Sequence, residues 1–171
     1  EGRSIQQTAD MLDRDPVDVV CDLLVDEALE VSYVSAGGNL ASMAALTPND
    51  PAFQPGFERA NTSVTAAISL YGYYGRHGSS ALPSSSPLGH LRTDAPPFFV
   101  THGDKDTVVL VEDARFFVEQ LRNSSSGPVV YAELPGAQHT FDLFHSIRFE
   151  SVVDAIEAFA AWVRSRDRRG R

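Results

Sequence analysis

Three polar residues with complementary chemistry each follow a short apolar stretch of the sequence: Ser35, Asp106 and His139. A serine hydroxyl is a weak nucleophile unless a neighbouring imidazole accepts its proton during attack. The imidazole in turn needs a buried carboxylate that holds its tautomer and stabilises its charged form. These residue types therefore indicate nucleophilic catalysis, provided that the fold brings the three side chains together.

The elements that would position them alternate along the chain. Strand-like stretches rich in β-branched and aromatic residues occupy residues 30–34, 64–71, 97–103 and 128–134. Apolar residues at helical spacing predict helices over 111–121 and 149–163, and a third helix whose buried face carries Leu40, Met43, Ala44 and Leu46. Strands that alternate with helices predict an α/β fold with a mostly parallel sheet. The carboxyl ends of such strands meet at one edge, where we expect the three polar residues to converge.

The first part of the chain has a different pattern. Ser4 is a candidate cap for a short helix that ends near Met11, and Asp15-Pro16 has the form of a second helix start. We therefore expect a helical segment over residues 1–32, followed by the α/β domain over residues 33–171. The single cysteine, Cys21, lies on the apolar side of this helical pattern and is expected to be a small core residue.

Composition excludes several classes of protein. The chain has 171 residues and a net charge of −9, which disfavours binding to a nucleic acid backbone. No run approaches the roughly 20 apolar residues of a membrane span, and no secretory signal pattern opens the chain. We therefore expect a soluble, cytoplasmic protein. The arginine-rich end, residues 164–171, is expected to be a solvated tail.

Three motifs resemble parts of one known family. The stretch SAGGNL (residues 35–40) is similar to the nucleophile elbow of hormone-sensitive-lipase-like esterases, HGDKDTVV (102–109) to their acid loop, and GAQHTFD (136–142) to their histidine loop. The span 35–166 resembles actinobacterial esterases of this group, and the order Ser, Asp, His is that of α/β-hydrolases. The resemblance implies a partial α/β-hydrolase fold that corresponds to the C-terminal half of the family's fold. It also implies that the protein cleaves small carboxylic esters through an acyl-enzyme, without a cofactor.

The resemblance also implies a role for each residue. Ser35 would be the nucleophile, His139 the general base, and Asp106 the acid that orients the imidazole, with Asp104 as the second candidate for that acid. The backbone N–H of Ala36 would donate to the oxyanion. A different interpretation of Ser35 remains open, since a serine at this place can instead cap the helix that follows it.

Two departures from the family pattern support an alternative function. The elbow has Tyr33 where the family has glycine, and residues 1–34 contain no His-Gly-Gly-type motif for further oxyanion donors. A catalytically impaired α/β-hydrolase remnant that acts as a binding or assembly module is therefore the second hypothesis. Unpaired sheet edges would then favour a homo-oligomer.

Residues 1–34 are similar to a C-terminal helical piece of N-acyl-D-amino-acid deacylases, which are metal-dependent enzymes of another fold. An ordinary amphipathic helical hairpin is the other interpretation of this segment. Because it contains no histidine, we expect no metal site there, and a metal-dependent aminoacylase fragment is the third and weakest hypothesis. His77, His90 and His145 lack the spacing of metal ligands.

Overall fold

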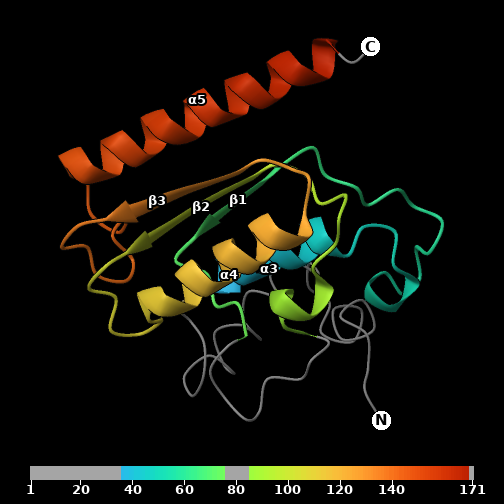
Figure 1. The fold of residues 1–171 in the computed structure, drawn as a ribbon, viewed down its shortest axis with the longest axis horizontal. Helices are drawn as coiled ribbons and strands as arrows, with labels where there is room; N and C mark the ends of the chain where they lie inside the picture. The colour runs from blue at the N-terminus through green and yellow to red at the C-terminus, as the bar shows by residue number, and fades with distance from the viewer. Residues whose placement is uncertain (1–35, 76–84, 170–171) are drawn as a thin grey trace, which may run out of the picture. The chain divides into compact units, whose positions relative to one another are not determined.

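The computed structural model describes residues 36–75 and 85–169 of the chain, and it describes the side chains of these ranges as far as residue 166. Three parallel strands form its sheet, in the order β1 (Ala67–Leu70), β2 (Phe98–Gly103) and β3 (Val129–Leu134) (Figure 1). The strands run in the same direction, so their carboxyl ends share one edge of the sheet. The predicted strand over 30–34 and the predicted domain boundary near residue 33 lie outside the described residues.

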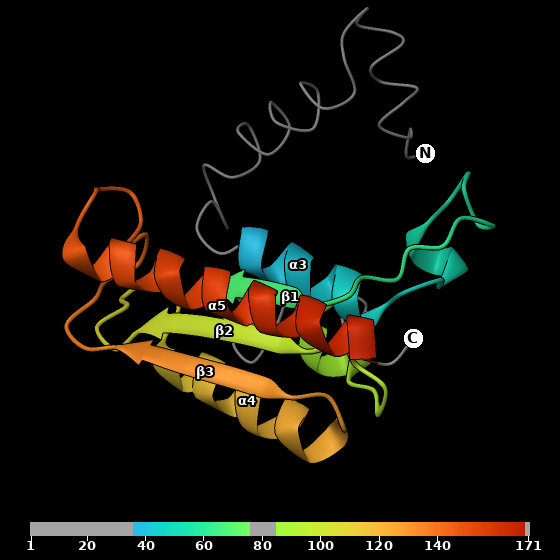
Figure 2. The same ribbon diagram turned by 90° about the horizontal axis from the view of Figure 1, so that it is seen from above.

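Helices cover both faces of this sheet. Helices α3 (Ala36–Leu46) and α4 (Val111–Ser124) lie on one face, and the long helix α5 (Ile147–Arg169) lies on the other, as Figures 1 and 2 show. Two short 3-10 helices, η1 (Pro51–Phe53) and η3 (Pro87–His90), lie in the connections. The arrangement is the predicted α/β architecture of three layers.

Aromatic side chains fill the core between the sheet and helices α3 and α4. The rings of Tyr74 and Phe117 stack with their centroids 4.1 Å apart, and both side chains are fully buried. Phe98 and Val100 of the central strand join this cluster. The Tyr74 hydroxyl is satisfied by a 2.7 Å hydrogen bond with the hydroxyl of Ser69, so this core buries a polar group without leaving it unpaired.

The opposite face of the sheet packs against α5. Phe99 forms a second cluster with Phe159 and Val163 of that helix. Successive residues of a strand point to opposite faces, which is why Phe98 and Phe99 belong to different clusters. The continuous apolar run of β2 is thus explained by helices on both sides, as is usual for parallel strands.

The predicted buried face of the first described helix is wrong in part. Leu40 is 56 % exposed and Ala44 is also exposed, whereas Gly38 and Ser42 are buried. A Cβ atom on Gly38 would lie 2.7 Å from both the Cα of Gly72 and the carbonyl oxygen of Leu70. Close contact between the backbones of α3 and of the segment at the end of β1 therefore requires a small residue at position 38, whereas Met43 and Leu46 are buried as predicted.

The strand predicted over 64–71 is shorter in the structure and ends at Leu70. Tyr71 leaves the strand with a φ of 38°, in the left-handed region. The Val129–Leu134 strand and the helices α4 and α5 lie where the sequence predicts them. None of the described helices combines the length and apolarity that crossing a membrane would require.

Candidate active site

Two of the predicted site residues meet at the carboxyl edge of the sheet. Asp106 lies in the loop after β2 and His139 in the loop after β3, and the imidazole Nδ1 is 2.5 Å from the carboxylate Oδ2. Only 5 % of Asp106 and 9 % of His139 is exposed. A buried hydrogen bond from imidazole to carboxylate fixes the proton on Nδ1 and directs Nε2 toward any nucleophile as the proton acceptor.

Backbone donors hold the carboxylate in place. The Oδ1 atom of Asp106 accepts hydrogen bonds from the N–H groups of Val108 at 2.9 Å and Val109 at 2.8 Å. Burial alone would raise the pKa of Asp106, but the hydrogen bonds from His102, His139 and these two amides outweigh burial and hold the pKa well below its usual range. Asp106 is therefore ionised, as a residue that stabilises an imidazolium must be.

A second imidazole contacts the same carboxylate oxygen. The Nε2 atom of His102 lies 3.1 Å from Oδ2 of Asp106 and 2.8 Å from the carbonyl oxygen of Val109. Both neighbours are acceptors, so Nε2 carries a proton and donates it. These contacts place His102 inside the acid loop, between the carboxylate of Asp106 and the backbone of Val109.

The alternative acid, Asp104, has a different set of contacts. Its Oδ1 accepts the N–H of Gly136 at 2.6 Å, and its backbone N–H donates to the carbonyl of Leu134 at 3.1 Å. Nearby, a Cβ atom on Gly103 would lie only 2.4 Å from the carbonyl oxygen of Ala137. The carboxylate of Asp104 thus ties the acid loop to the histidine loop, whereas the carboxylate that bonds the imidazole is that of Asp106.

Tyr71 completes the surroundings of the imidazole. Its ring lies edge-on to His139 with the centroids 4.6 Å apart, and its hydroxyl donates to Oδ1 of Asp142 at 2.8 Å. Sequence reasoning placed Tyr71 inside a strand and missed this contact. The available signal was an aromatic residue between the strand and Gly72, at the carboxyl end where chemistry is expected.

The proposed nucleophile, Ser35, lies outside the described residues. Ala36, which the sequence assigns to the oxyanion site, is the first residue of α3. The start of this helix is held at the sheet edge by Asn39, whose side-chain amide donates to the carbonyl of Tyr73 at 2.8 Å. The hydroxyl of Ser69 in β1 donates to the carbonyl of Gly38 at 3.0 Å, so the first turns of α3 are attached to the end of β1.

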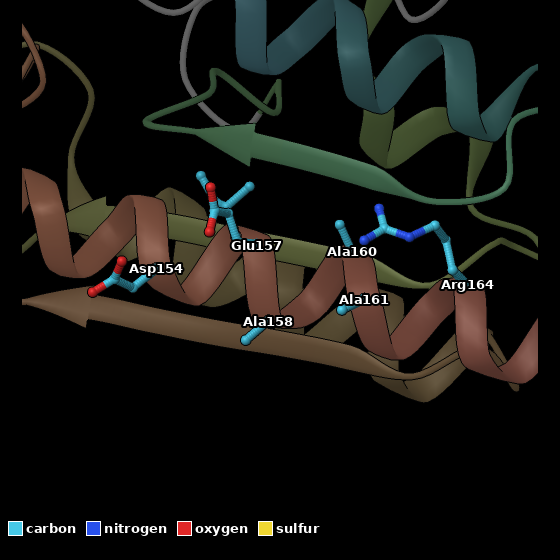
Figure 3. Close-up of a pocket in the computed structure, with 7 residues that line it drawn as sticks. Asp154, Glu157, Ala158, Ala160, Ala161 and Arg164 are labelled. Carbon is cyan, nitrogen blue, oxygen red and sulfur yellow. The ribbon is translucent and has the colours of Figure 1, made fainter.

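Other candidate sites are weaker. Within the described ranges, no group of three His, Cys, Asp or Glu side chains could hold a metal ion. The described residues that line an open hollow of about 620 Å³ all belong to α5, among them Asp154, Glu157 and Arg164 (Figure 3). These lining residues include neither a nucleophile nor an imidazole, so the pair of Asp106 and His139 is the better candidate for chemistry.

Three proteins of Mycobacterium tuberculosis are similar to the chain in sequence. LipM, a probable carboxylic ester hydrolase, is 47 % identical over 154 residues, covering 75 % of this chain and 36 % of the relative. The esterases LipQ and LipC are each 38 % identical, covering 73 % and 77 % of this chain and 35 % and 39 % of their own lengths. The chain therefore spans a little over a third of the length of these curated relatives.

Solved structures share the fold. Esterase 2 of Thermogutta terrifontis, phosphoramylated by tabun, superposes with a TM-score of 0.66 and 23 % sequence identity over 75 % of this chain and 52 % of that chain. The propionate-bound form of the same esterase gives a TM-score of 0.64 and 22 % identity, with 76 % and 54 % covered. No protein-family model matches the chain. The chain is thus homologous to the hormone-sensitive-lipase-like esterases, and its described residues form the C-terminal part of an α/β-hydrolase fold.

Proposed function

We propose that the chain carries the active-site residues of a serine carboxylesterase. The single observation that supports this most directly is the buried hydrogen bond between Asp106 and His139 at the carboxyl edge of the sheet. The similarity to three mycobacterial esterases supports the same reaction class. In this proposal Ser35 is the nucleophile, His139 the general base and acid, and Asp106 the orienting carboxylate.

The proposed reaction has two halves. The Ser35 hydroxyl attacks the ester carbonyl as Nε2 of His139 accepts its proton, and Asp106 stabilises the imidazolium that forms. The tetrahedral intermediate collapses when the imidazolium returns this proton to the departing alkoxide, which leaves an acyl-serine. Water then attacks the acyl-serine with the same imidazole as base, and the carboxylic acid is released. This chemistry requires no cofactor.

The oxyanion would be stabilised at the start of α3. The first N–H groups of a helix have no partners within that helix and point along the positive end of its dipole. Ala36 is the first residue of α3, so its N–H is suited to donate to the oxygen that becomes negative. The attachment of this helix to the end of β1 through Gly38 and Asn39 supports a donor of fixed position.

A covalent probe tests the proposal directly. We expect a fluorophosphonate to label the wild-type protein and a p-nitrophenyl ester to be hydrolysed, with both signals lost in Ser35→Ala. The matched control is Ser63→Ala, because Ser63 is an exposed serine whose backbone N–H is bonded only locally, to the side chain of Asn61. Labelling that persists without the Ser35 hydroxyl would refute the assignment of the nucleophile.

The same experiment distinguishes the second hypothesis, a catalytically impaired remnant, from an active esterase. Tyr33 at the glycine position of the elbow favours a catalytically impaired remnant that binds or assembles. That hypothesis predicts no labelling in the wild type or in either variant, although the protein is folded. Three further statements about the protein remain predictions from its sequence: a cytoplasmic location, no nucleic acid partner, and a homo-oligomer.

A further inference from the structure

Backbone strain is concentrated around His139. Three described non-glycine residues have a positive φ, and two of them, Tyr71 at 38° and Thr140 at 52°, flank this imidazole. A non-glycine residue in the left-handed region is unfavourable and persists only where its surroundings hold it there. Strain of this kind is concentrated at functional sites. The contacts that these two residues make with His139 are therefore of interest.

The unusual conformation of Tyr71 aims its ring at the histidine loop. The backbone N–H of Tyr71 still donates to the carbonyl of Thr101 at 2.9 Å, so the turn begins directly at the end of β1. The ring then packs edge-on against His139, at 4.6 Å between centroids, and against Phe141, at 5.2 Å. An edge-to-face pair of aromatic rings has a preferred geometry and so restricts the tilt of the imidazole.

The hydroxyl of Tyr71 adds a second restraint. It donates to Oδ1 of Asp142 at 2.8 Å, a hydrogen bond between residues 71 positions apart in the sequence. Burial, the hydrogen bond to Asp142 and the negative charge of that carboxylate together raise the pKa of Tyr71 to about 12. The phenol therefore keeps its proton at any physiological pH, so ionisation does not break the hydrogen bond that connects the end of β1 to the histidine loop.

We infer that Tyr71 is a positioning residue for His139: its ring sets the tilt of the imidazole, and its hydroxyl, through Asp142, anchors the loop that carries it. Asp106 restrains the imidazole at Nδ1, and Tyr71 restrains the ring itself. The two restraints together leave Nε2 pointing in one direction. The consequence for catalysis rests on the proposed function, but the geometric role does not.

The experiment uses the full chain and follows the hydrogen-bonded Nδ1–H of His139 by proton NMR, alongside ester hydrolysis. Tyr71→Phe keeps the ring and removes the hydroxyl, Tyr71→Leu removes both, and Asp142→Ala removes the acceptor. Tyr131→Phe is the matched control, because its hydroxyl also donates to a carboxylate, that of Glu133 at 2.9 Å, and Tyr131 has no ring contact with His139. Circular dichroism establishes that each variant is folded.

We expect Tyr71→Phe and Asp142→Ala each to accelerate solvent exchange of the Nδ1–H about tenfold. The double variant, which combines Tyr71→Phe with Asp142→Ala, should exchange no faster than either single variant, because both changes remove the same hydrogen bond. Tyr71→Leu should accelerate exchange further and lower kcat about 10²-fold with little change in KM, because the base is misplaced while substrate binding remains. Tyr131→Phe should match the wild type.

Exchange in Tyr71→Phe and Asp142→Ala that equals the wild-type rate would overturn the inference, as would equal effects from Tyr131→Phe. The NMR measurement does not depend on turnover. A wild-type protein that hydrolyses no ester, but whose Nδ1–H responds as described, would refute the proposed function and leave the positioning role of Tyr71 intact. If Tyr71→Leu fails to fold, the comparison of Tyr71→Phe with Tyr131→Phe still tests whether Tyr71 positions His139.

Discussion

The Nε2 atom of His102 lies 3.1 Å from Oδ2 of Asp106, the carboxylate oxygen that also accepts the hydrogen bond of His139. One oxygen therefore receives two imidazole N–H donors, while the other oxygen of Asp106 receives two backbone donors. With four donors, the carboxylate remains charged although it is buried. His102 is thus part of the environment that makes Asp106 suitable as an orienting acid.

Replacing His102 should test this support. His102→Leu leaves a buried carbonyl and a buried carboxylate oxygen each short of one donor, so we expect the free energy of unfolding to fall by about 1 to 3 kcal/mol or more. His102→Gln can still donate from its side-chain amide and should lose less. Urea denaturation of both variants checks the prediction, and an equal loss in the two would show that packing, and not the donor, matters.

The low pKa of Asp106 predicts how stability depends on pH. Its pKa is depressed in the folded state, so its contribution to stability is complete above the unfolded-state pKa of about 3.9 and is lost as pH falls below that value. We expect the free energy of unfolding to drop steeply below about pH 4 in the wild type. Asp106→Asn, measured over the same pH range, should have a flatter curve, and an unchanged slope would contradict the prediction.

The two acid candidates should separate in activity. Under the proposed mechanism, Asp106→Asn keeps the size of the side chain but removes the charge that selects the imidazole tautomer, and we expect kcat to fall about 10⁴-fold. Asp104→Asn retains an oxygen that can accept the N–H of Gly136 and should keep activity within about tenfold of wild type. Comparable losses in both would reopen the choice of acid.

The contact between the two site loops has no room for a side chain at residue 103. In Gly103→Ala the new methyl group would lie 2.4 Å from the carbonyl oxygen of Ala137, so the histidine loop must move. We expect a loss of about 1 to 3 kcal/mol in the free energy of unfolding. Gly37→Ala is the control, because no atom lies within 4 Å of its Cβ position and alanine in a helix should stabilise by about 0.5 to 1 kcal/mol.

Sequence patterns predicted the elements of the sheet well and its details less well. The strands near 97–103 and 128–134 and the helices α4 and α5 were predicted correctly, because burial on both faces or on one helical face leaves a clear apolar pattern. The buried face of α3 was wrong in part: Met43 and Leu46 are buried as predicted, whereas Leu40 and Ala44 are exposed. Gly38 is selected by the distance between two backbones, which composition does not encode.

The sequence also indicated part of the candidate site. Motif position favours Asp106 over Asp104 as the orienting acid, and this choice stays a prediction that the hydrogen bond to His139 supports. Tyr71 could not be found by the same means, because its importance arises from a φ of 38° and from a partner 71 residues away. Such a contact depends on how separate loops meet in space, and no local pattern records it.

The contact of Asp106 with His139 closes a loop of 33 residues within one strand–helix–strand unit, whereas that of Tyr71 with Asp142 closes one of 71 residues. Closing the longer loop costs about 0.7 kcal/mol more in chain entropy, from the logarithmic dependence on loop length. The contact of Asp106 with His139 is therefore the more local of the two. The contact of Tyr71 with Asp142 also joins β1 to this unit, because Tyr71 directly follows that strand.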